Sequence, residues 1–326
     1  MYDFINLLGG IVLFLYGLLL VAKATMSLTE GENGKRVASL CKRPIGGLLT
    51  GALVSAITQS SVAVNYIAVE LVEMKVISFY SSAAVVMGAN IGTTATAQIV
   101  SAVGLKSGIV GGILSIIGLL LGFFKNKTVK NLSNALLGLG VLFAGFTKMQ
   151  SGANGLSLSE WFTNLLLIEN PFLLFLVGML FTGITQSSSA LTGLIVVLAN
   201  CKLIGFSSAA YLTLGSNVGS CFSVVILSMG KKVEARRTAF FNFAFNLLGA
   251  ILVFPLIYFF ESGITLLLTR GKTTGKAIAD FHTLFNLICS IVFLPVLKIL
   301  TRVVELIVKE NSPKPIKNLK TFFPKI

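Results

Sequence analysis

The stretch "TGITQSSSALTG" (residues 182–193) places Gln186 and the three serines that follow it inside a long apolar segment. A second copy, "SAITQSSVAVNY" (55–66), lies upstream and carries Gln59 and two serines in the same arrangement. Polar side chains are costly at membrane depth, and where they occur they mark substrate and ion pathways. The doubled motif is therefore the first place to look for function.

A shift of 127 residues aligns the two copies, and eight of thirteen positions are identical between 51–63 and 178–190. The same shift, without a gap, aligns "GANIGTT" (88–94) with "GSNVGSC" (215–221). A shared Gly/Ser/Leu-rich composition would not put two separate motifs in one register. The sequence therefore predicts an internal repeat.

The composition is typical of a membrane protein. Of the 326 residues, 55% are hydrophobic and only 12% are charged, and a soluble domain would have about twice that charged fraction. Several apolar runs approach the roughly 20 residues that cross a bilayer as a helix. The formal net charge of +14 comes from short loops and a lysine-bearing tail, which predicts contact with anionic lipid and not with nucleic acid. The four cysteines have no metal-binding spacing and are expected to pack.

Each copy is predicted to contain the same four segments. These are a spanning helix, an apolar segment broken at Gln-Ser-Ser, a helix interrupted by Gly-x-Asn-x-Gly, and a final spanning helix. An interfacial segment, a last spanning helix and a basic cytoplasmic tail follow. The segments are 4–28, 44–74, 78–103 and 107–124 in the first copy (1–127), and 131–150, 171–201, 205–229 and 236–260 in the second (128–260); the interfacial segment and last helix (near 281–303) occupy 261–303, and the tail 304–326.

The segments around the two Gln-Ser-Ser motifs have about 14 residues on each side of the break. At 1.5 Å per residue, an arm of that length is too short to cross a bilayer alone. Two short arms joined at a polar tip predict a re-entrant hairpin, which enters and leaves the membrane on one side. The alternative is one straight helix with Ser and Gln on a buried face.

Basic residues lie after the first helix, between the copies, after the second interrupted helix and in the tail. Because cytoplasmic loops are enriched in Lys and Arg, these segments are predicted to be cytoplasmic and the amino terminus external. Each copy then crosses the membrane three times, so the copies must be inverted. Arg270, Lys272 and Lys276 disagree, because they would lie outside. The predicted fold is an all-α, multi-pass protein of the cell membrane with two inverted-topology repeats, an arrangement typical of secondary transporters.

The four polar breaks offer ligands for ions of both signs. Half-helix amino ends suit an anion, and unwound carbonyls suit a hard cation such as Na⁺. The breaks contain no Asp, Glu, Lys, Arg or His, so proton coupling through titrating side chains is disfavoured. A bound anion would need cations as its counter-charge. The pattern predicts cation-coupled anion transport.

The motifs "TQSSVA", "TQSSSA", "GANIGTT" and "GSNVGS" resemble those of the type II sodium–phosphate cotransporter family, as do "AFFNFAFN" (239–246) and "ADFHTLFN" (279–286). The resemblance covers most of residues 1–290. It implies symport of inorganic phosphate with Na⁺ by alternating access, with no enzymatic activity and no cofactor. A phosphate exporter, or another anion transporter or channel on the same scaffold, remains the alternative. An intramembrane enzyme is disfavoured, because the serines of the tips have no base beside them.

The resemblance also implies which residues bind phosphate and Na⁺. They lie at the two tips and the two breaks: Gln59, Ser60, Ser61, Gln186, Ser187, Ser188, Ser189, Asn90, Thr93, Thr94, Asn217 and Ser220, with Thr58 and Thr185 as further candidates for Na⁺. The sequence departs from the family pattern at Val62, in place of a third serine, and at Ser220-Cys221, in place of Thr-Thr. Either change could remove a Na⁺ ligand. Many bacterial relatives carry a soluble carboxyl-terminal helical domain, which this sequence is expected to lack.

Three further features carry expectations. His282 is the sole histidine, and the related stretch at 239–246 has Asn242 in its place, which predicts a hydrogen-bonding packing role. Glu70 and Glu73 are expected near the exit of the first hairpin, where Lys75 is close enough to pair with them. The small-residue run "GIVGGILSIIG" (108–118) permits close helix contact, either in the core or at a homodimer face.

Overall fold

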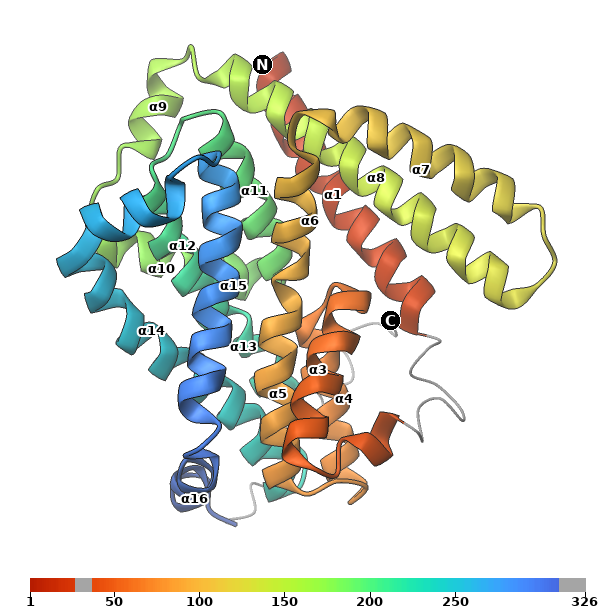
Figure 1. Cartoon of the computed structure of the whole chain (residues 1–326), viewed down its shortest axis with the longest axis vertical. Coiled ribbons are helices and arrows are strands. Elements are labelled where there is room, and N and C mark those ends of the chain that lie inside the picture. The colour runs from red at the N-terminus through yellow and green to blue at the C-terminus, as the bar shows by residue number, and fades with distance from the viewer. Residues whose placement is uncertain (27–36, 311–326) are drawn as a thin grey trace.

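The computed structural model describes residues 1–26 and 37–310, and all statements about contacts and partners refer to these residues. Lys35, Arg36 and most of the predicted basic tail lie outside them. The described chain is helical (Figure 1). The helices are α1 (Tyr2–Met26), α3 (Pro44–Thr58), α4 (Ser61–Glu73), α5 (Phe79–Thr93), α6 (Ala95–Val103), α7 (Ser107–Gly122), α8 (Lys127–Leu156), α9 (Glu160–Leu166), α10 (Pro171–Thr185), α11 (Ser188–Asn200), α12 (Phe206–Gly219), α13 (Cys221–Ser228), α14 (Val233–Thr269), α15 (Thr274–Phe293) and α16 (Leu297–Ile307).

Six helical segments of the described chain are long and apolar enough to cross a membrane. This number and the apolar composition make the chain a multi-pass membrane protein. Four of the six are the single helices α1, α8, α14 and α15, and the other two are the pairs α5–α6 and α12–α13. The helices α3, α10 and α11 are apolar but shorter.

The predicted repeat register is visible in the helix boundaries. α10 and α11 begin and end 127 residues after α3 and α4. α5 packs on α3, and α12 packs on α10. The first helices of the two copies, α1 and α8, pack along each other, and α7 covers the other side of α8 (Figure 1).

Glycines let α1 and α8 approach closely. A Cβ atom on Gly17 would lie 2.4 Å from the Leu142 nitrogen, and one on Gly145 would lie 2.4 Å from the Phe14 nitrogen. Such small-residue contacts are the usual way in which helices associate inside lipid. Early residues of α1 meet late residues of α8, so the two helices are antiparallel.

The Gly-x-Asn-x-Gly motifs do not interrupt their helices, which corrects the sequence-based expectation. Both motifs are helical, and the breaks follow at Thr94, between α5 and α6, and at Ser220, between α12 and α13. The glycines serve close packing instead. A Cβ on Gly88 would lie 1.9 Å from the Leu48 carbonyl oxygen, and one on Gly215 would lie 1.9 Å from the Phe175 carbonyl oxygen.

The carboxyl-terminal part also differs from the prediction. α14 runs to Thr269 but has a kink at Phe260, where the backbone is not helical, so the predicted closing helix ends where the sequence placed its end. The part of α14 after the kink makes the first half of the predicted interfacial segment helical, and the predicted last helix is divided into α15 and α16. α7 has 16 residues, fewer than a perpendicular span needs. It packs on α8, whereas α14 packs on α4, α5, α12 and α13. The closing helices of the two copies therefore occupy different places.

Candidate functional site

The two Gln-Ser-Ser motifs adopt the same backbone conformation. Gln59 (φ 56°, ψ 25°) and Gln186 (φ 56°, ψ 22°) are left-handed residues that end α3 and α10. Ser60 and Ser187 are extended and accept a hydrogen bond, 3.2 Å long in each case, from the backbone N–H three residues later. The serine thus caps the next helix. One straight helix through either motif is therefore wrong, because each segment is two helices joined at a polar tip.

The two tips meet in the interior through a third residue. The Thr96 hydroxyl donates to Oε1 of Gln59 (2.7 Å) and lies 3.3 Å from Oγ of Ser189. The Ser189 hydroxyl also reaches the Gln59 carbonyl oxygen at 3.5 Å. All three residues are buried. The structure thus unites one predicted residue from each tip and adds Thr96, which lies just beyond the end of "GANIGTT" in the first turn of α6.

The surroundings of the tips differ despite their common backbone. Gln59 is 7% exposed, whereas Gln186 is exposed. The 127-residue shift places Ser223 at the position of Thr96. The Ser223 hydroxyl is buried, and no hydrogen-bond partner for it is found in the described part of the chain. The side chain of Gln59 is therefore docked, whereas that of Gln186 is not.

The asparagines of the two Gly-x-Asn-x-Gly motifs each contact one of the last two long helices. Asn90 donates through Nδ2 to Oδ1 of Asn242 on α14 (3.2 Å). Oδ1 of Asn217 lies 3.1 Å from Nε2 of His282 on α15. His282 thus occupies the hydrogen-bonding position that the sequence predicted. The similar stretches 239–246 and 279–286 serve the first and second copy respectively.

Aromatic contacts repeat the same correspondence. Phe79 at the start of α5 makes an edge-to-face contact with Phe241, with ring centroids 6.3 Å apart. Phe206 at the start of α12 makes the same contact with Phe281, at 5.8 Å. Edge-to-face pairs of this kind stabilise buried aromatic clusters. α14 and α15 therefore hold the two broken helices in equivalent ways.

A buried polar path links the two breaks. The Cys221 thiol lies 3.4 Å from the Asn217 carbonyl oxygen and 3.5 Å from that of Asn242. Along this path several buried polar atoms have no partner among residues 1–26 and 37–310. They are Nδ2 of Asn217 and Asn242, Oδ1 of Asn246 and Asn286, and Nδ1 of His282. Unsatisfied buried groups are costly, so this region has spare capacity to bind an ion or water.

Most of the other predicted hydroxyls bond to their own helix. Thr94 donates to the Ile91 carbonyl (2.8 Å), and Ser220 donates to the Asn217 carbonyl (2.7 Å). Thr58 and Thr185 donate to carbonyls four residues earlier, at 2.8 Å each. Ser61, Ser188 and Thr93 are buried. The structure thus connects Gln59 with Ser189 directly and leaves these hydroxyls within one turn of the tips and breaks.

The described residues contain no group of three or more His, Cys, Asp and Glu side chains that could hold a metal ion. The polar oxygens at the tips and breaks belong to neutral amide, hydroxyl and carbonyl groups, the kind that unwound transporter helices use for Na⁺.

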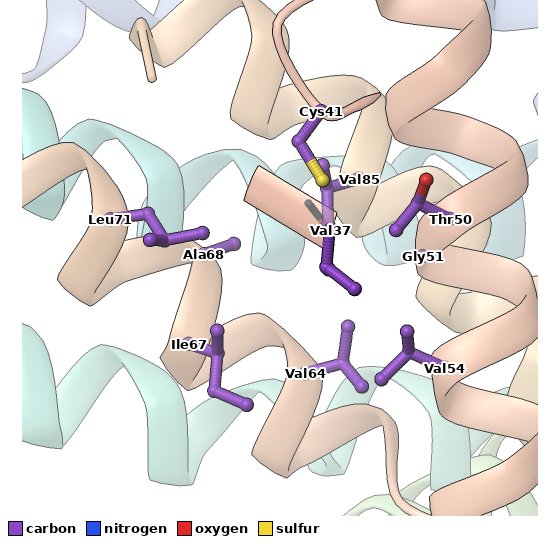
Figure 2. A pocket seen from close by; sticks show the side chains of 10 residues that line it. All are labelled: Val37, Cys41, Thr50, Gly51, Val54, Val64, Ile67, Ala68, Leu71 and Val85. Carbon is purple, nitrogen blue, oxygen red and sulfur yellow. The ribbon is translucent and has the colours of Figure 1, made fainter. Parts of the chain in front are cut away.

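An apolar cavity of about 130 Å³ lies between α3, α4 and α5 (Figure 2). Ten residues line it, and the side-chain heteroatoms among them are the Thr50 hydroxyl and the Cys41 thiol. Without a charged or amide group, this cavity has nothing to recognise phosphate. It lies inside the first hairpin and is separate from the polar tip contact.

Comparison with known proteins identifies the family. The Na⁺/Pi-cotransporter family matches residues 13–151 and 153–290. The uncharacterized protein YqeW of Bacillus subtilis is 29% identical over 91% of this chain and 96% of its own length. "Putative inorganic phosphate export protein YjbB" of Escherichia coli is 24% identical over 95% of this chain, which spans 57% of that relative. Rat sodium-dependent phosphate transport protein 2A is 30% identical over 40% of this chain and 20% of its own length.

No solved structure gives a significant match. The family matches together cover nearly all of residues 13–290, and they include both tips and both breaks. The chain belongs to the Na⁺/Pi-cotransporter family, whose members transport phosphate.

Proposed function

We propose that the chain is a Na⁺-coupled symporter of inorganic phosphate that works by alternating access in the cell membrane. The observation that carries this proposal is the contact of the two repeat tips through Gln59, Thr96 and Ser189. Two homologous tips that meet at a buried polar point are what a single shared site requires. Phosphate and Na⁺ would bind there, among the neutral oxygens and N–H groups of the tips and breaks.

Two inverted repeats, residues 1–127 and 128–260, are part of the proposal. The equivalent helices α1 and α8 are antiparallel. The second hairpin arm of each copy packs on the second part of the other copy's broken helix, α4 on α13 and α11 on α6. This exchange is what a two-fold axis between the copies would produce. Under the same proposal α3–α4 and α10–α11 are re-entrant hairpins that enter from opposite sides, as in other transporters with inverted repeats.

The distribution of charge supports an external amino terminus and a cytoplasmic carboxyl terminus. Lys231 and Lys232 contact Glu70 and Glu73 at the base of the first hairpin. Arg237 nearby reaches the Val308 carbonyl at the end of α16. Basic residues of separate segments therefore gather at one end of the molecule, the end predicted to be cytoplasmic. Glu70 and Glu73 were expected to pair with Lys75, and that expectation is wrong.

The basic group that disagreed with this orientation has a local partner. Asp280 pairs with Lys272 (2.6 Å) and with Lys276 (2.5 Å). One carboxylate thus offsets part of the charge at the opposite end of the molecule.

Uptake of labelled phosphate into proteoliposomes tests the function. An inward Na⁺ gradient should drive accumulation, and replacing Na⁺ by choline at fixed pH should abolish it. An imposed proton gradient without Na⁺ should not restore it, because the tips and breaks have no titrating side chain apart from the neighbouring His282. Equal uptake in Na⁺ and choline would refute Na⁺ coupling.

Net phosphate export is the second candidate. It is favoured by the Escherichia coli relative, which matches 95% of this chain and is named for phosphate export. Vesicles loaded with phosphate distinguish the two functions. Efflux that proceeds at the same rate without Na⁺ on either side would support export by uncoupled transport, whereas efflux that needs internal Na⁺ would be the symporter running in reverse.

A further inference from the structure

A second pocket, of about 320 Å³, lies at the end of the molecule opposite Lys231, Lys232 and Arg237. It is formed where α6 and α11 end and α15 begins. The end of α6 and the start of α15 lie in the upper half of Figure 1. Its polar lining comes from Ser101, Asn200, Lys202, Lys272, Thr273 and Thr274, and the lining includes no carboxylate. The volume is at the low end of the range typical of ligand pockets.

The repeat explains why this place is open. At the other end, Lys231 pairs with Glu70 at 2.7 Å, and Lys232 donates through its backbone N–H to Glu73 at 2.8 Å. These contacts close the junction of α4 with the α13–α14 turn. The 127-residue shift replaces Glu73 by Asn200 and Lys231 by Gly104. Both Asn200 and Gly104 line the pocket. The counterpart of the ionic junction is therefore an open space, because the counterparts of Glu73 and Lys231 carry no charge.

The position of Lys202 is fixed by the backbone. It lies in the left-handed region (φ 59°), like its repeat counterpart Lys75 (φ 60°). Its N–H donates to the Ala199 carbonyl at 3.1 Å, which holds the turn that ends α11. Lys202 has no ion-pair partner among the described residues. Its charge is therefore available to a ligand.

Nearby groups keep the second lysine in place. Lys272 is held by Asp280. Asn200 accepts a hydrogen bond from the Gly275 N–H at 3.1 Å, which fixes the start of α15 against α11. The lining contains the charged groups Lys202 and Lys272, and Asp280, which pairs with Lys272, also pairs with Lys276. These four groups together carry a net charge of +2. They lie near the amino end of a 20-residue helix, which adds a favourable field for an anion.

We propose that this pocket binds a phosphate-bearing anion ahead of the buried tips, with Lys202 as its principal charged ligand. Free inorganic phosphate and the headgroup of an anionic lipid share this chemistry. As an entry site for transported phosphate, the pocket rests on the proposed function. As an anion site, the pocket does not rest on the proposed function, because an anion can bind there without Na⁺ and without transport.

The direct test measures protection of a cysteine at the pocket. Ser101→Cys is introduced into a Cys201→Ser background, which removes the one partly exposed thiol among the native cysteines. The other three native cysteines are buried. The protein is placed in nanodiscs of pure phosphatidylcholine, in choline buffer without Na⁺. Inorganic phosphate should slow the reaction of the introduced thiol with the uncharged reagent N-ethylmaleimide. A cysteine placed at Val76, at the opposite end, should react at the same rate with and without phosphate.

Two matched variants assign the charge. Lys202→Gln should raise the half-protecting phosphate concentration about three- to tenfold, which corresponds to the loss of one partly screened charge contact. Lys75→Gln removes the same charge from the same backbone conformation at the opposite end and should leave protection unchanged. Equal effects of the two variants would refute the assignment to Lys202.

The lipid arm repeats the measurement in nanodiscs with phosphatidylglycerol. Protection by phosphate in phosphatidylcholine identifies a free anion as the ligand. Protection that appears with phosphatidylglycerol, and not with phosphate, identifies a lipid headgroup. Absence of protection in both arms overturns the proposal. Failure of Na⁺-driven uptake would leave these outcomes unaffected and would count against the proposed function alone.

Discussion

The two tips have nearly identical backbones and opposite surroundings. At the first, Gln59 is buried and accepts a hydrogen bond from Thr96. At the second, Gln186 is exposed, and the equivalent hydroxyl on Ser223 is buried without a partner among the described residues. The local sequence determines the shape of a tip, and the neighbouring helices determine whether it is docked. The difference concerns the two glutamines, because Ser189 of the second tip takes part in the contact with Gln59 and Thr96.

The largest effect is expected where the two halves are alike. Gly88→Val and Gly215→Val each place atoms against a backbone carbonyl that a Cβ would already approach to 1.9 Å. Because backbone cannot move aside cheaply, each variant should lose more than about 3 kcal/mol of stability. Size-exclusion profiles and thermal melting would show this. Gly112→Val is the control, because no atom apart from its own helix backbone lies within 4 Å of its Cβ position. A stable, monodisperse Gly88→Val protein beside an unstable Gly215→Val protein would break the equivalence.

The next effect separates the tips. Gln59→Ala removes a buried acceptor and leaves Thr96 without it, so stability should fall by about 1–3 kcal/mol. Gln186→Ala removes an exposed side chain and should leave the melting temperature within about 1 °C of the parent, by the usual neutrality of surface changes. Both should weaken phosphate transport, by roughly ten- to a hundredfold in apparent affinity if each glutamine contacts a charged ligand. Normal uptake in both variants would contradict a shared site at the tips.

A smaller effect tests Thr96, the residue that joins the tips. Thr96→Val keeps the shape and removes the hydroxyl between Gln59 and Ser189, so it should cost about 1–2 kcal/mol and slow uptake. Ser223→Ala removes a hydroxyl for which no partner is described and should be neutral or slightly stabilising. Thermal melting and uptake on the same preparations compare them. A larger loss for Ser223→Ala would mean that the second tip is the docked one under those conditions.

The smallest effect concerns Val62, which aligns with Ser189. Val62 packs against a buried cluster of Val69, Val224, Ala235 and Ala239. Val62→Ser should therefore lose about 1 kcal/mol of stability through reduced apolar burial and leave the Na⁺ dependence of uptake unchanged. An increase in apparent Na⁺ affinity would show instead that a hydroxyl at this position binds the cation.

The sequence predicted features that depend on local chemistry. Each Gln-Ser-Ser motif contains its own left-handed glutamine and capping serine, so the division of both hairpin segments at their tips could be predicted from the sequence. Register was predictable too, because helix boundaries follow the 127-residue shift. The contribution of the tips to binding stays a prediction.

Features that depend on distant partners were missed. The sequence predicts helix breaks at Gly88 and Gly215, whereas the two glycines allow close packing. This role depends on carbonyl groups in the preceding hairpin, which the motif alone does not reveal. Thr96 carries no motif of its own, and its importance arises from Gln59 and Ser189 in other helices. The pairing of Glu70 with Lys231 joins residues of different copies. The doubled Thr96 and Ser223 positions were the one available signal, since the repeat shift aligns two hydroxyls there.

The glycine-lined contact of α1 with α8 has a consequence for biosynthesis. Gly17 lies against Gly138, and a ribosome adding roughly 5–20 residues per second needs on the order of ten seconds to make the chain between them. During that interval the face of α1 that will contact α8 is covered by lipid or by another membrane protein. The first copy therefore enters the bilayer without α8, the helix of the second copy on which α1 packs. Two half-chains synthesised separately in one cell should find each other through this pair of helices, with α1 as the waiting partner.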